Sequence, residues 1–349
     1  MLETDPRIKP EVLLQFAVPY LEAMGCKPRI AVEVAHHLVD AELCGVYSHG
    51  IFRLVPYAEK ALAGDYNVGA EPFWRHADGG AALVDGDNGL GISAFLLAVD
   101  EAVKRAKSSG IAAVGVVNVD HTGRIGDFAA RAARAGCLSI IFGGGSRKNW
   151  RQVAPYGGAK GVLPTNPYAF AIPADGPDPV VIDFATSSGA GGKVFAAKQA
   201  GRDLPEGLCI DANGRPTVNP DDYINGGALL PMAGPKGYGM ALVAELLGEA
   251  LMGQARDGMN WICICIDMNN YRDSTSYKRA AEDCLHELRS CPPAPGFDRV
   301  EIPGEREFQM RQKRTALGIP IPPATIEALC NMARKLDIKQ ELVASLDIR

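Results

Sequence analysis

Apolar residues recur at helical spacing near both ends of the chain. Residues 10–24 and 29–44 show this spacing, and each stretch is followed by a glycine, as is common just past a helix end. From residue 325 onward the chain again has helical spacing and, like its beginning, no strand-like run. We therefore predict that residues 1–75 and 315–349 fold together as one helical domain.

The middle of the chain, residues 76–314, alternates short apolar runs with stretches of helical spacing. The predicted strands are residues 81–86, 111–118, 138–142, 168–173, 180–184 and 261–267, and the predicted helices are residues 92–109, 124–135, 193–200, 236–252 and 275–289. Gly, Asp, Asn and Pro between residues 64 and 80 indicate a crossing between domains, and residues 201–233 are rich in loops. Strands that alternate with helices indicate a layered α/β or α+β fold.

Composition and charge narrow the class of protein. A chain of 349 residues with 47% hydrophobic and 22% charged residues can form two globular domains. The net charge of -5, and a densest basic run (residues 311–314) without aromatic neighbours, argue against a nucleic-acid partner. The acidic N-terminus does not resemble a signal peptide, and no window approaches the ~20 apolar residues of a membrane helix. We expect a cytoplasmic protein with no membrane association.

Cysteines and histidines give no metal-ligand pattern. The nine cysteines lack a paired framework and are expected to be free thiols in a reducing compartment. Cys263 and Cys265 would point to the same side of an apolar strand, which favours two buried thiols over a metal site. His36 and His37 have Asp40 and Glu33 four residues away, a spacing that favours contacts on the helix surface. We therefore predict no metal site.

The densest group of chemically active side chains lies in residues 47–57. If Ser48 caps a helix that begins at His49, then His49, Arg53 and Tyr57 are spaced i, i+4 and i+8 and share one face. Pro56 lacks an amide hydrogen, so we expect the helix to kink or restart there. We interpret this segment as the chemical face of an oxidoreductase.

Glycine-rich turns follow several predicted strands, but none fits a familiar nucleotide fingerprint. The turns after residues 81–86 and 111–118 do not have the G-x-G-x-x-G pattern of a Rossmann fold. Gly189 to Lys193 is similar to a phosphate loop, yet Ser187 replaces its first glycine and Val194 replaces its metal-binding Ser/Thr. Lys236 lies at the entry to a predicted helix, where its charge and the free amides suit a pyrophosphate.

The order of short motifs along the chain resembles a known family. The motifs are Ser48-His49-Gly50-x-x-Arg53, Asn118-x-x-His121, Ala154-Pro155-Tyr156-Gly157-Gly158, Thr165-Asn166-Pro167, Asp183-x-Ala185-Thr186-Ser187, Lys236-Gly237-Tyr238-Gly239, Pro303-Gly304-Glu305 and Gly318-Ile319-Pro320-Ile321-Pro322. Together they resemble the malate/L-lactate dehydrogenase family, which also includes ureidoglycolate and diketogulonate dehydrogenases and the Δ1-piperideine/Δ1-pyrroline-2-carboxylate reductases. The resemblance runs from about residue 10 to residue 345.

The resemblance implies a non-Rossmann nicotinamide-binding sheet domain beside a helical substrate domain. It implies a homodimer with the active site near the subunit interface, and a small-molecule carboxylate as substrate. The expected reaction moves a hydride between NAD(P)H and the α-carbon of a small 2-oxo or 2-hydroxy acid. The alternatives are a reductase of cyclic or N-alkyl 2-imino acids, and a nicotinamide-binding sensor that has lost its chemistry.

The resemblance also implies roles for individual residues. His49 would deliver the proton, with Ser48 as its hydrogen-bonded companion, and Arg53 would bind the substrate carboxylate, to which a planar guanidinium is suited. Tyr57 and Thr165 would contact the substrate. The implied cofactor-binding residues are His121, Gly123, Asp183, Phe184, Ala185, Lys236, Gly237, Pro303, Gly304 and Glu305. In the ureidoglycolate branch the histidine that matches His121 is instead the catalytic base; we favour His49, and His121 remains the alternative.

Two positions bear on the finer specificity. The imine-reductase branch has an acidic relay residue where this chain has Lys193, so either the relay is absent or a carboxylate such as Asp183 replaces it. Arg147 and Lys148 follow a glycine turn and could pair with a 2′-phosphate, which favours NADP over NAD; a solvated basic loop is the alternative.

Overall fold

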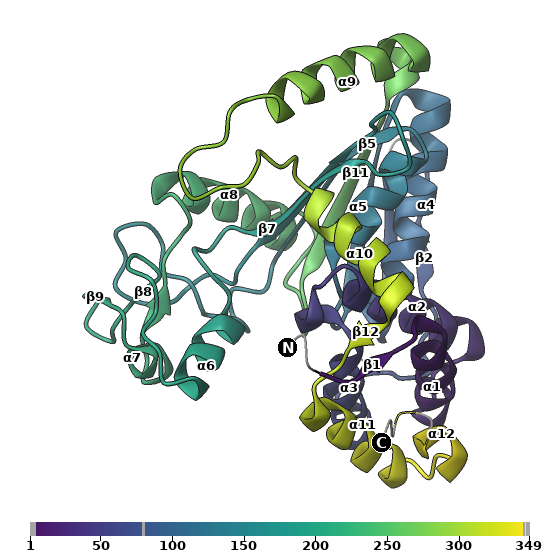
Figure 1. Cartoon of the computed structure of the whole chain (residues 1–349), viewed down its shortest axis with the longest axis vertical. Coiled ribbons are helices and arrows are strands. Elements are labelled where there is room, and N and C mark those ends of the chain that lie inside the picture. The colour runs from purple at the N-terminus through teal and green to yellow at the C-terminus, as the bar shows by residue number, and fades with distance from the viewer. Residues whose placement is uncertain (1–4, 79–80, 345, 347–349) are drawn as a thin grey trace.

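Helices from the two ends of the chain lie side by side in the computed structural model, which describes residues 5–78, 81–344 and 346 (Figure 1). They are α1 (Pro10–Ala23), α2 (Pro28–Leu43), α3 (Leu54–Ala63), α11 (Pro323–Lys335) and α12 (Gln340–Ala344). The two ends are also joined by an antiparallel pair of short strands, β1 (Arg7–Ile8) and β12 (Ile319–Pro320). The prediction that the beginning of the chain lacks strands is therefore wrong, whereas the described residues from 325 onward form helices and no strand, as predicted.

A mixed seven-stranded sheet forms the centre of the molecule. Its order is β2 (Phe73–His76), β3 (Ala81–Gly89), β4 (Ile111–Val119), β11 (Asn260–Asp267), β5 (Cys137–Gly144), β6 (Pro167–Ile172) and β7 (Val180–Ala185). Only β3 and β4 run parallel; the other neighbours are antiparallel. This pattern confirms the predicted mixed α/β fold and differs from the parallel sheet of a Rossmann domain. The strand β2 was not predicted.

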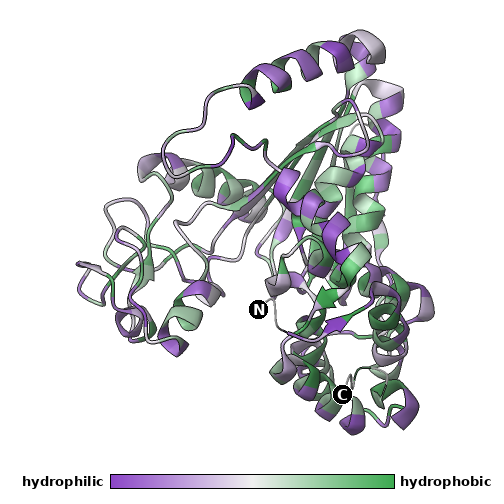
Figure 2. Ribbon diagram, in the orientation of Figure 1, coloured by the Kyte–Doolittle hydropathy of each residue, from purple (hydrophilic) through white to green (hydrophobic). Residues whose placement is uncertain are grey.

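Helices cover both faces of the sheet. On one face lie α4 (Gly91–Ser109) and α5 (Ile125–Arg134), and on the other lie α8 (Pro235–Glu245) and its π-helical continuation η3 (Leu246–Leu251). A Cβ at Gly144 would come within 2.0 Å of the Ala244 carbonyl oxygen, so this glycine allows α8 to approach the sheet closely. Figure 2 shows that apolar residues dominate the strands and the helix faces that meet them.

The loop-rich segment forms a separate lobe beside the sheet (Figure 1). It contains α6 (Gly191–Gln199), α7 (Pro220–Ile224) and the short strands β8 (Cys209–Ile210), β9 (Pro216–Thr217) and β10 (Ala228–Leu229). Two further α-helices lie outside these groups: α9 (Ser274–Arg289) is at the far end of the sheet, and α10 (Glu305–Leu317), which was not predicted, packs on α2.

One large apolar cluster runs from the terminal helices into the sheet. Phe16 and Leu38 of the terminal helices, Phe95 and Phe128 of the sheet-covering helices, and the sheet residue Cys263 all belong to it and are essentially fully buried. Because the core is shared, the division into two domains remains a prediction. Cys265 is equally buried, with 3.9 Å between the two sulfur atoms, so the expectation of two buried thiols is confirmed.

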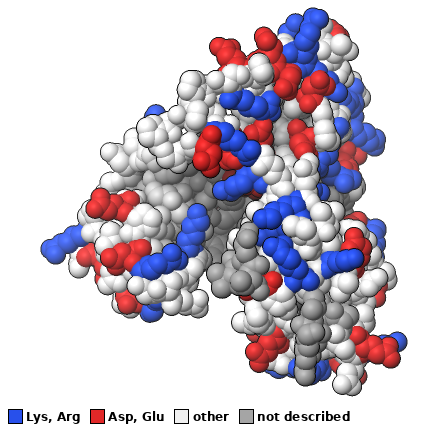
Figure 3. Space-filling model, in the orientation of Figure 1, with Lys and Arg blue, Asp and Glu red and all other residues white. Residues whose placement is uncertain are grey.

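The described surface carries both signs of charge. On the face shown in Figure 3, acidic and basic side chains are interspersed. Among the described residues, no helix is both long and apolar enough to cross a bilayer.

Candidate active site

The segment before α3 is built differently from the prediction. Two short 3-10 helices, Tyr47–His49 and Ile51–Arg53, precede α3, and Gly50 between them is extended. Ser48 therefore does not cap a helix that begins at His49. Pro56 falls in the first turn of α3, where a missing amide hydrogen leaves no bond unmade, so the helix starts there and is not kinked.

His49, Arg53 and Tyr57 nevertheless line one cavity of about 330 Å³. The loop after β4 and the start of β6 complete much of the wall. From the predicted set, the cavity also contains His121, Gly123, Thr165 and Asp183. The structure thus brings together predicted residues that are up to 134 positions apart, from His49 to Asp183.

A chain of hydrogen bonds joins Tyr57, His121 and His49. The Tyr57 hydroxyl lies 2.6 Å from His121 Nδ1, and the backbone N–H of Gly123 donates to the same nitrogen at 3.3 Å. Since an N–H can only donate, Nδ1 accepts, and a neutral His121 carries its proton on Nε2. That nitrogen lies 3.2 Å from His49 Nδ1, which must accept in turn. Neutral His49 therefore carries its proton on Nε2, for which no protein partner exists among the described residues.

Burial keeps both imidazoles neutral. It lowers the pKa of His49 to about 3, with a further contribution from the charge of Arg53. It also holds the pKa of His121 well below the ordinary value, and Arg53 again adds to the effect. At neutral pH both rings are therefore neutral, and the Nδ1 atom of each already accepts a hydrogen bond.

Arg53 is the cation in this cavity whose guanidinium is free of a carboxylate partner in the described chain and can therefore bind an anionic ligand. Its Nε donates to the Ser48 carbonyl oxygen at 2.5 Å and its guanidinium lies 5.5 Å from the centre of the Phe52 ring. Within the described chain no carboxylate forms an ion pair with it, whereas the neighbouring Lys60 is paired with Asp120. Ser48 contributes this carbonyl, and in the described residues its hydroxyl makes no hydrogen bond to His49.

A second cavity, also of about 330 Å³, adjoins the first at Asp183, which lines both. Pro303 and Gly304 lie on its wall, and the Pro303 carbonyl oxygen accepts from the Val181 amide at 3.1 Å. Gly304 has a φ of 97° and precedes α10, a left-handed conformation that favours glycine. Asp183 accepts from the Gly126 amide at 2.8 Å, and desolvation raises the pKa of its carboxyl.

Three other predicted cofactor residues are sequence neighbours of residues that line this second cavity, but they line neither cavity themselves. Phe184 and Ala185 follow Asp183 at the end of β7, and the Phe184 ring stacks on Tyr168 with 6.2 Å between centres. Glu305 begins α10, where it accepts from the Ile302 amide and pairs with Arg289 at 2.8 Å.

Lys236, Gly237, Arg147 and Lys148 line neither cavity. Lys236 and Gly237 form the first turn of α8. Both Arg147 and Lys148 pair with Glu249, at 2.7 and 3.8 Å. Lys193 is exposed on α6, in the separate lobe.

The first cavity, which His49 and Arg53 line, also contains residues that the sequence analysis did not predict. Lys60 follows Arg53 by seven residues, two helical turns, so extending the spacing argument would have found it. Trp150 and Met259 reach the cavity from loops, for which no periodic signal exists.

His37 corrects another prediction. It does not pair with Glu33 on the surface of α2, because Glu33 binds Arg29 at 2.7 Å and His37 is buried with Nδ1 3.1 Å from Asp127. No local pattern could have predicted this partner, which is 90 positions away.

A buried carboxyl supports the turn that carries His49. Glu42 of α2 is 1% exposed and accepts from the Ile51 amide at 3.0 Å. A Cβ at Gly50 would come within 2.1 Å of this carboxyl, so only glycine fits. Burial raises the pKa of Glu42 to about 7, although the Ile51 amide and the charge of Arg314 oppose the shift.

This shift predicts how stability depends on pH. A carboxyl whose pKa rises on folding, here from 4.5 to about 7, stabilises the fold fully below pH 4.5 and loses that contribution as pH rises through 7. Glu42→Gln stays neutral and keeps the acceptor for Ile51. As pH rises from 4.5 to 8, the unfolding free energy of the variant should therefore increase by up to roughly 3 kcal/mol relative to that of the unmodified protein. Urea unfolding at both pH values measures this, and a difference that does not change with pH would contradict it.

Comparison with known proteins identifies the family. The sequence model of malate/L-lactate dehydrogenase matches residues 8–330. Malate dehydrogenase of Pyrococcus horikoshii is 33% identical in sequence over 95% of this chain and 96% of its own. The solved structure of malate dehydrogenase from this organism superposes with a TM-score of 0.87 and 31% identity, and the match covers 97% of each chain. Ureidoglycolate dehydrogenase (NAD(+)) of Escherichia coli K12 is 33% identical over 90% of this chain and 92% of its own. The structure of Δ1-piperideine-2-carboxylate reductase from Pseudomonas syringae pvar. tomato has a TM-score of 0.83 at 26% identity and covers 94% of this chain and 100% of that one. The chain therefore belongs to the malate/L-lactate dehydrogenase family of oxidoreductases.

Proposed function

We propose that this protein transfers a hydride between a nicotinamide cofactor and the α-carbon of a small 2-oxo or 2-hydroxy carboxylic acid. The observation that carries the proposal is the Arg53 guanidinium, which has no carboxylate partner in the described part of the chain and lies in the same cavity as the hydrogen-bonded pair His49 and His121. Relatives named for malate and ureidoglycolate, both of which are 2-hydroxy acids, support the substrate class.

Arg53 would bind the substrate carboxylate. Its planar fork of donors matches the two oxygens of a carboxylate, and its position next to His49 would place the adjacent α-carbon near the imidazole. Tyr57 and Thr165 line the same cavity and would contact the rest of the substrate.

His49 would exchange the proton with the substrate heteroatom, and His121 would support it. Both nitrogens of His121 are engaged by protein groups, whereas the Nε2 of His49 has no protein partner in the described structure. The proton that neutral His49 carries on Nε2 suits the reduction direction, in which His49 would give it to the substrate oxygen. His121 Nε2–H would then pass a proton to His49 Nδ1, and the Tyr57 hydroxyl would pass one to His121 Nδ1, so both rings stay neutral. Oxidation would run the same transfers in reverse, starting from an ionised Tyr57.

The nicotinamide cofactor would occupy the second cavity and reach the first at Asp183. The residues fit such a group, because the Asp183 carboxylate, held by the Gly126 amide, can accept from cofactor hydroxyl or amide groups. The proposed contacts are Gly123, Asp183, Phe184, Ala185, Pro303, Gly304 and Glu305, with Lys236 and Gly237 as further candidates on α8. When bound, the cofactor supplies or receives the hydride.

The alternative substrate class is a 2-imino acid. Its support is the structural similarity to the Pseudomonas syringae reductase. Lys193, at the position of the expected relay acid, is exposed on α6 and brings no carboxylate to the cavity; Asp183 lines the cavity and would have to take that part. A non-catalytic sensor is disfavoured, because the His49 and Arg53 set is intact.

A substrate screen tests the proposal. Absorbance of the reduced cofactor is followed with pyruvate, oxaloacetate, glyoxylate-derived ureides and cyclic imines. We expect turnover with 2-oxo acids; turnover only with cyclic imines would favour the alternative, and cofactor binding without any turnover would favour the sensor.

We propose NADP as the preferred cofactor, on the basis of Arg147 and Lys148. A 2′-phosphate would have to compete with Glu249, which now pairs with both cations. Replacing both by alanine should raise the KM for NADPH about tenfold, the effect of losing one charge-assisted contact, and leave the KM for NADH unchanged. A KM ratio that does not change would show that the loop does not select the cofactor.

We also propose a homodimer in the cytoplasm. Leu242, Val243, Leu246 and Leu251 are exposed apolar residues of α8 and η3, a surface that a second copy could cover. All nine cysteines are free thiols, as a reducing compartment would keep them.

A further inference from the structure

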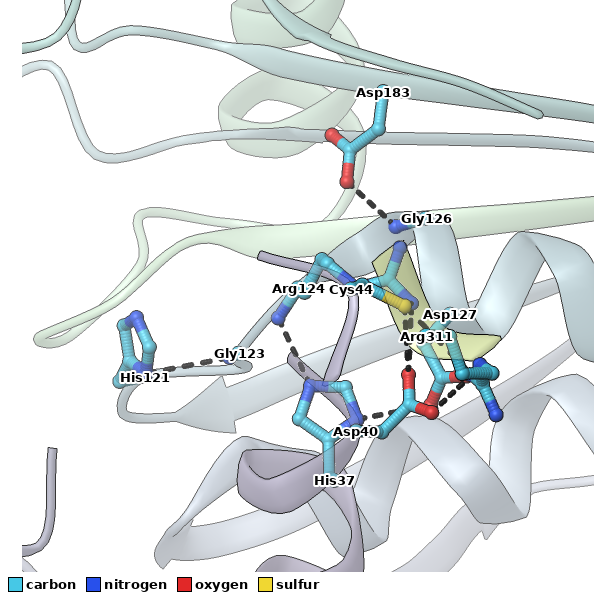
Figure 4. Close-up of polar contacts among 10 residues, drawn as sticks. All are labelled: His37, Asp40, Cys44, His121, Gly123, Arg124, Gly126, Asp127, Asp183 and Arg311. Atoms are coloured by element: carbon cyan, nitrogen blue, oxygen red, sulfur yellow. Dashed lines mark hydrogen bonds and ion pairs between the residues drawn. The ribbon is translucent and has the colours of Figure 1, made fainter. Parts of the chain in front are cut away.

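A third histidine, His37, lies against the loop that carries His121 (Figure 4). His37 is 4% exposed and stacks on Phe128, with 4.8 Å between ring centres. Its Nε2 lies 2.9 Å from the backbone nitrogen of Arg124, and its Nδ1 lies 3.1 Å from the Asp127 carboxylate. His37 does not line the first cavity, in which His49 and Arg53 lie.

These contacts fix the tautomer of His37. The Arg124 amide can only donate, so Nε2 accepts and the ring proton lies on Nδ1, from which it is donated to Asp127. Burial opposes the charge on Asp127, but the hydrogen bond from His37 and the charge of Arg124 hold the pKa of this carboxyl below its usual value. His37 is therefore held in one tautomer.

His37 also shapes the backbone next to His121. A Cβ at Gly123 would lie 2.2 Å from His37 Nε2, so the loop rests directly on the imidazole. With a φ of 76°, Gly123 turns the chain and donates its own N–H to His121 Nδ1. This N–H makes Nδ1 an acceptor and so sets the tautomer of His121.

A separate contact anchors the side chain of Arg124. Its guanidinium pairs with Asp40 at 2.8 Å, and Arg311 of α10 binds the same carboxylate (Figure 4). Loss of the His37 acceptor would leave the buried Arg124 amide without a partner while this ion pair still held the segment. The loop would then shift without a general loss of the fold.

We propose that His37, oriented by Asp127, is a positioning residue that holds the 121–124 loop so that His121 stays in a single tautomer toward His49. The inference rests on the proposed function for its effect on turnover, but the tautomer of His121 can be measured without any substrate.

The test compares two substitutions of His37 with one of its neighbour. His37→Met removes the acceptor at similar volume, His37→Gln can offer its amide oxygen to Arg124, and His36→Met is the control, because His36 is exposed on the same helix. We expect His37→Met to lower kcat about ten- to a hundredfold, the cost of a misplaced group, with the KM for the carboxylate changed less than about twofold. His37→Gln should recover most of kcat, and His36→Met should match the unmodified protein.

Imidazole nitrogen shifts, recorded with ¹⁵N-labelled histidine, provide the readout that does not depend on activity. His121 should show only the Nε2–H tautomer in the unmodified protein and in His37→Gln, and a mixture in His37→Met. If His37→Met does not fold, His37→Asn, which is too short to reach the Arg124 amide, takes its place with the same expectation. An unchanged His121 tautomer, or a rise in KM in place of the fall in kcat, would overturn the proposal. Absence of turnover in the unmodified protein would refute the proposed function and leave the tautomer result standing.

Discussion

Replacing Arg53 with alanine is expected to lower kcat/KM for a 2-oxo acid about 100- to 1,000-fold, mainly through KM. Arg53 is the cation in the cavity without a carboxylate partner in the described chain, and losing one side of a hydrogen-bonded charge pair costs about 2–5 kcal/mol. Steady-state kinetics with saturating NADPH or NADH measure the effect.

Two further variants make the result specific. Arg53→Lys keeps the charge but loses the planar fork, so an intermediate loss is expected. Lys60→Ala removes a cation from the same cavity, but one that already pairs with Asp120, and should cost less than about tenfold. Equal losses for Arg53→Ala and Lys60→Ala would mean that Arg53 has no special role in binding the carboxylate.

Removing His49 is expected to cost more than removing His121. His49→Ala should lower kcat about 10²- to 10⁴-fold, the usual contribution of a proton-transfer group. His121→Ala should cost less, because His121 supports His49 through one hydrogen bond, and the double variant should be little worse than His49→Ala alone. If His121→Ala costs more, the two histidines exchange roles.

The pH profile checks the same assignment independently. Because burial keeps both rings neutral, reduction starts from the resting protonation state, and kcat/KM for the oxo acid should be flat between about pH 5 and 8. Oxidation starts from an ionised Tyr57, whose pKa burial raises, so kcat/KM for the hydroxy acid should rise about tenfold per pH unit over that range. A reduction profile that falls tenfold per pH unit would mean that His49 must first be protonated and would contradict the assignment.

The spacing of His49, Arg53 and Tyr57 predicted a shared location correctly even though the helix begins later than expected. The two 3-10 helices and α3 follow one another closely, so side chains four positions apart still reach the same cavity. The part of the prediction that was wrong is that Ser48 caps a helix beginning at His49. Gly50 is extended and breaks the path between His49 and Ile51, so the Ser48 hydroxyl has no helix end to bind.

Periodicity identified every central strand that is long and apolar, and it failed where the signal is not local. The strands β1 and β12 have two residues each, and their pairing joins Arg7 to Pro320. The helix α10 is mostly polar, with Phe308 and Arg314 as its buried residues, so its apolar period is weak. Periodicity could not predict polar contacts between distant residues either, such as that of His37 with Asp127.

The glycine turns were informative through what they excluded. Because neither nucleotide fingerprint fitted, a parallel Rossmann sheet was not expected, and the sheet has one parallel pair among its neighbours. The sequence could not reveal that Asp183 and Pro303 would border one cavity, since β7 and the start of α10 meet only in the folded chain.

The central claim is hydride transfer between the α-carbon and the nicotinamide, and isotope transfer measures it directly. The protein is incubated with the oxidised cofactor and the hydroxy form of the best acid in the screen, deuterated at the α-carbon. The account predicts one deuterium at C4 of the nicotinamide ring in the reduced cofactor, read by mass spectrometry and proton NMR. Reduced cofactor that carries only solvent hydrogen at C4 would contradict it.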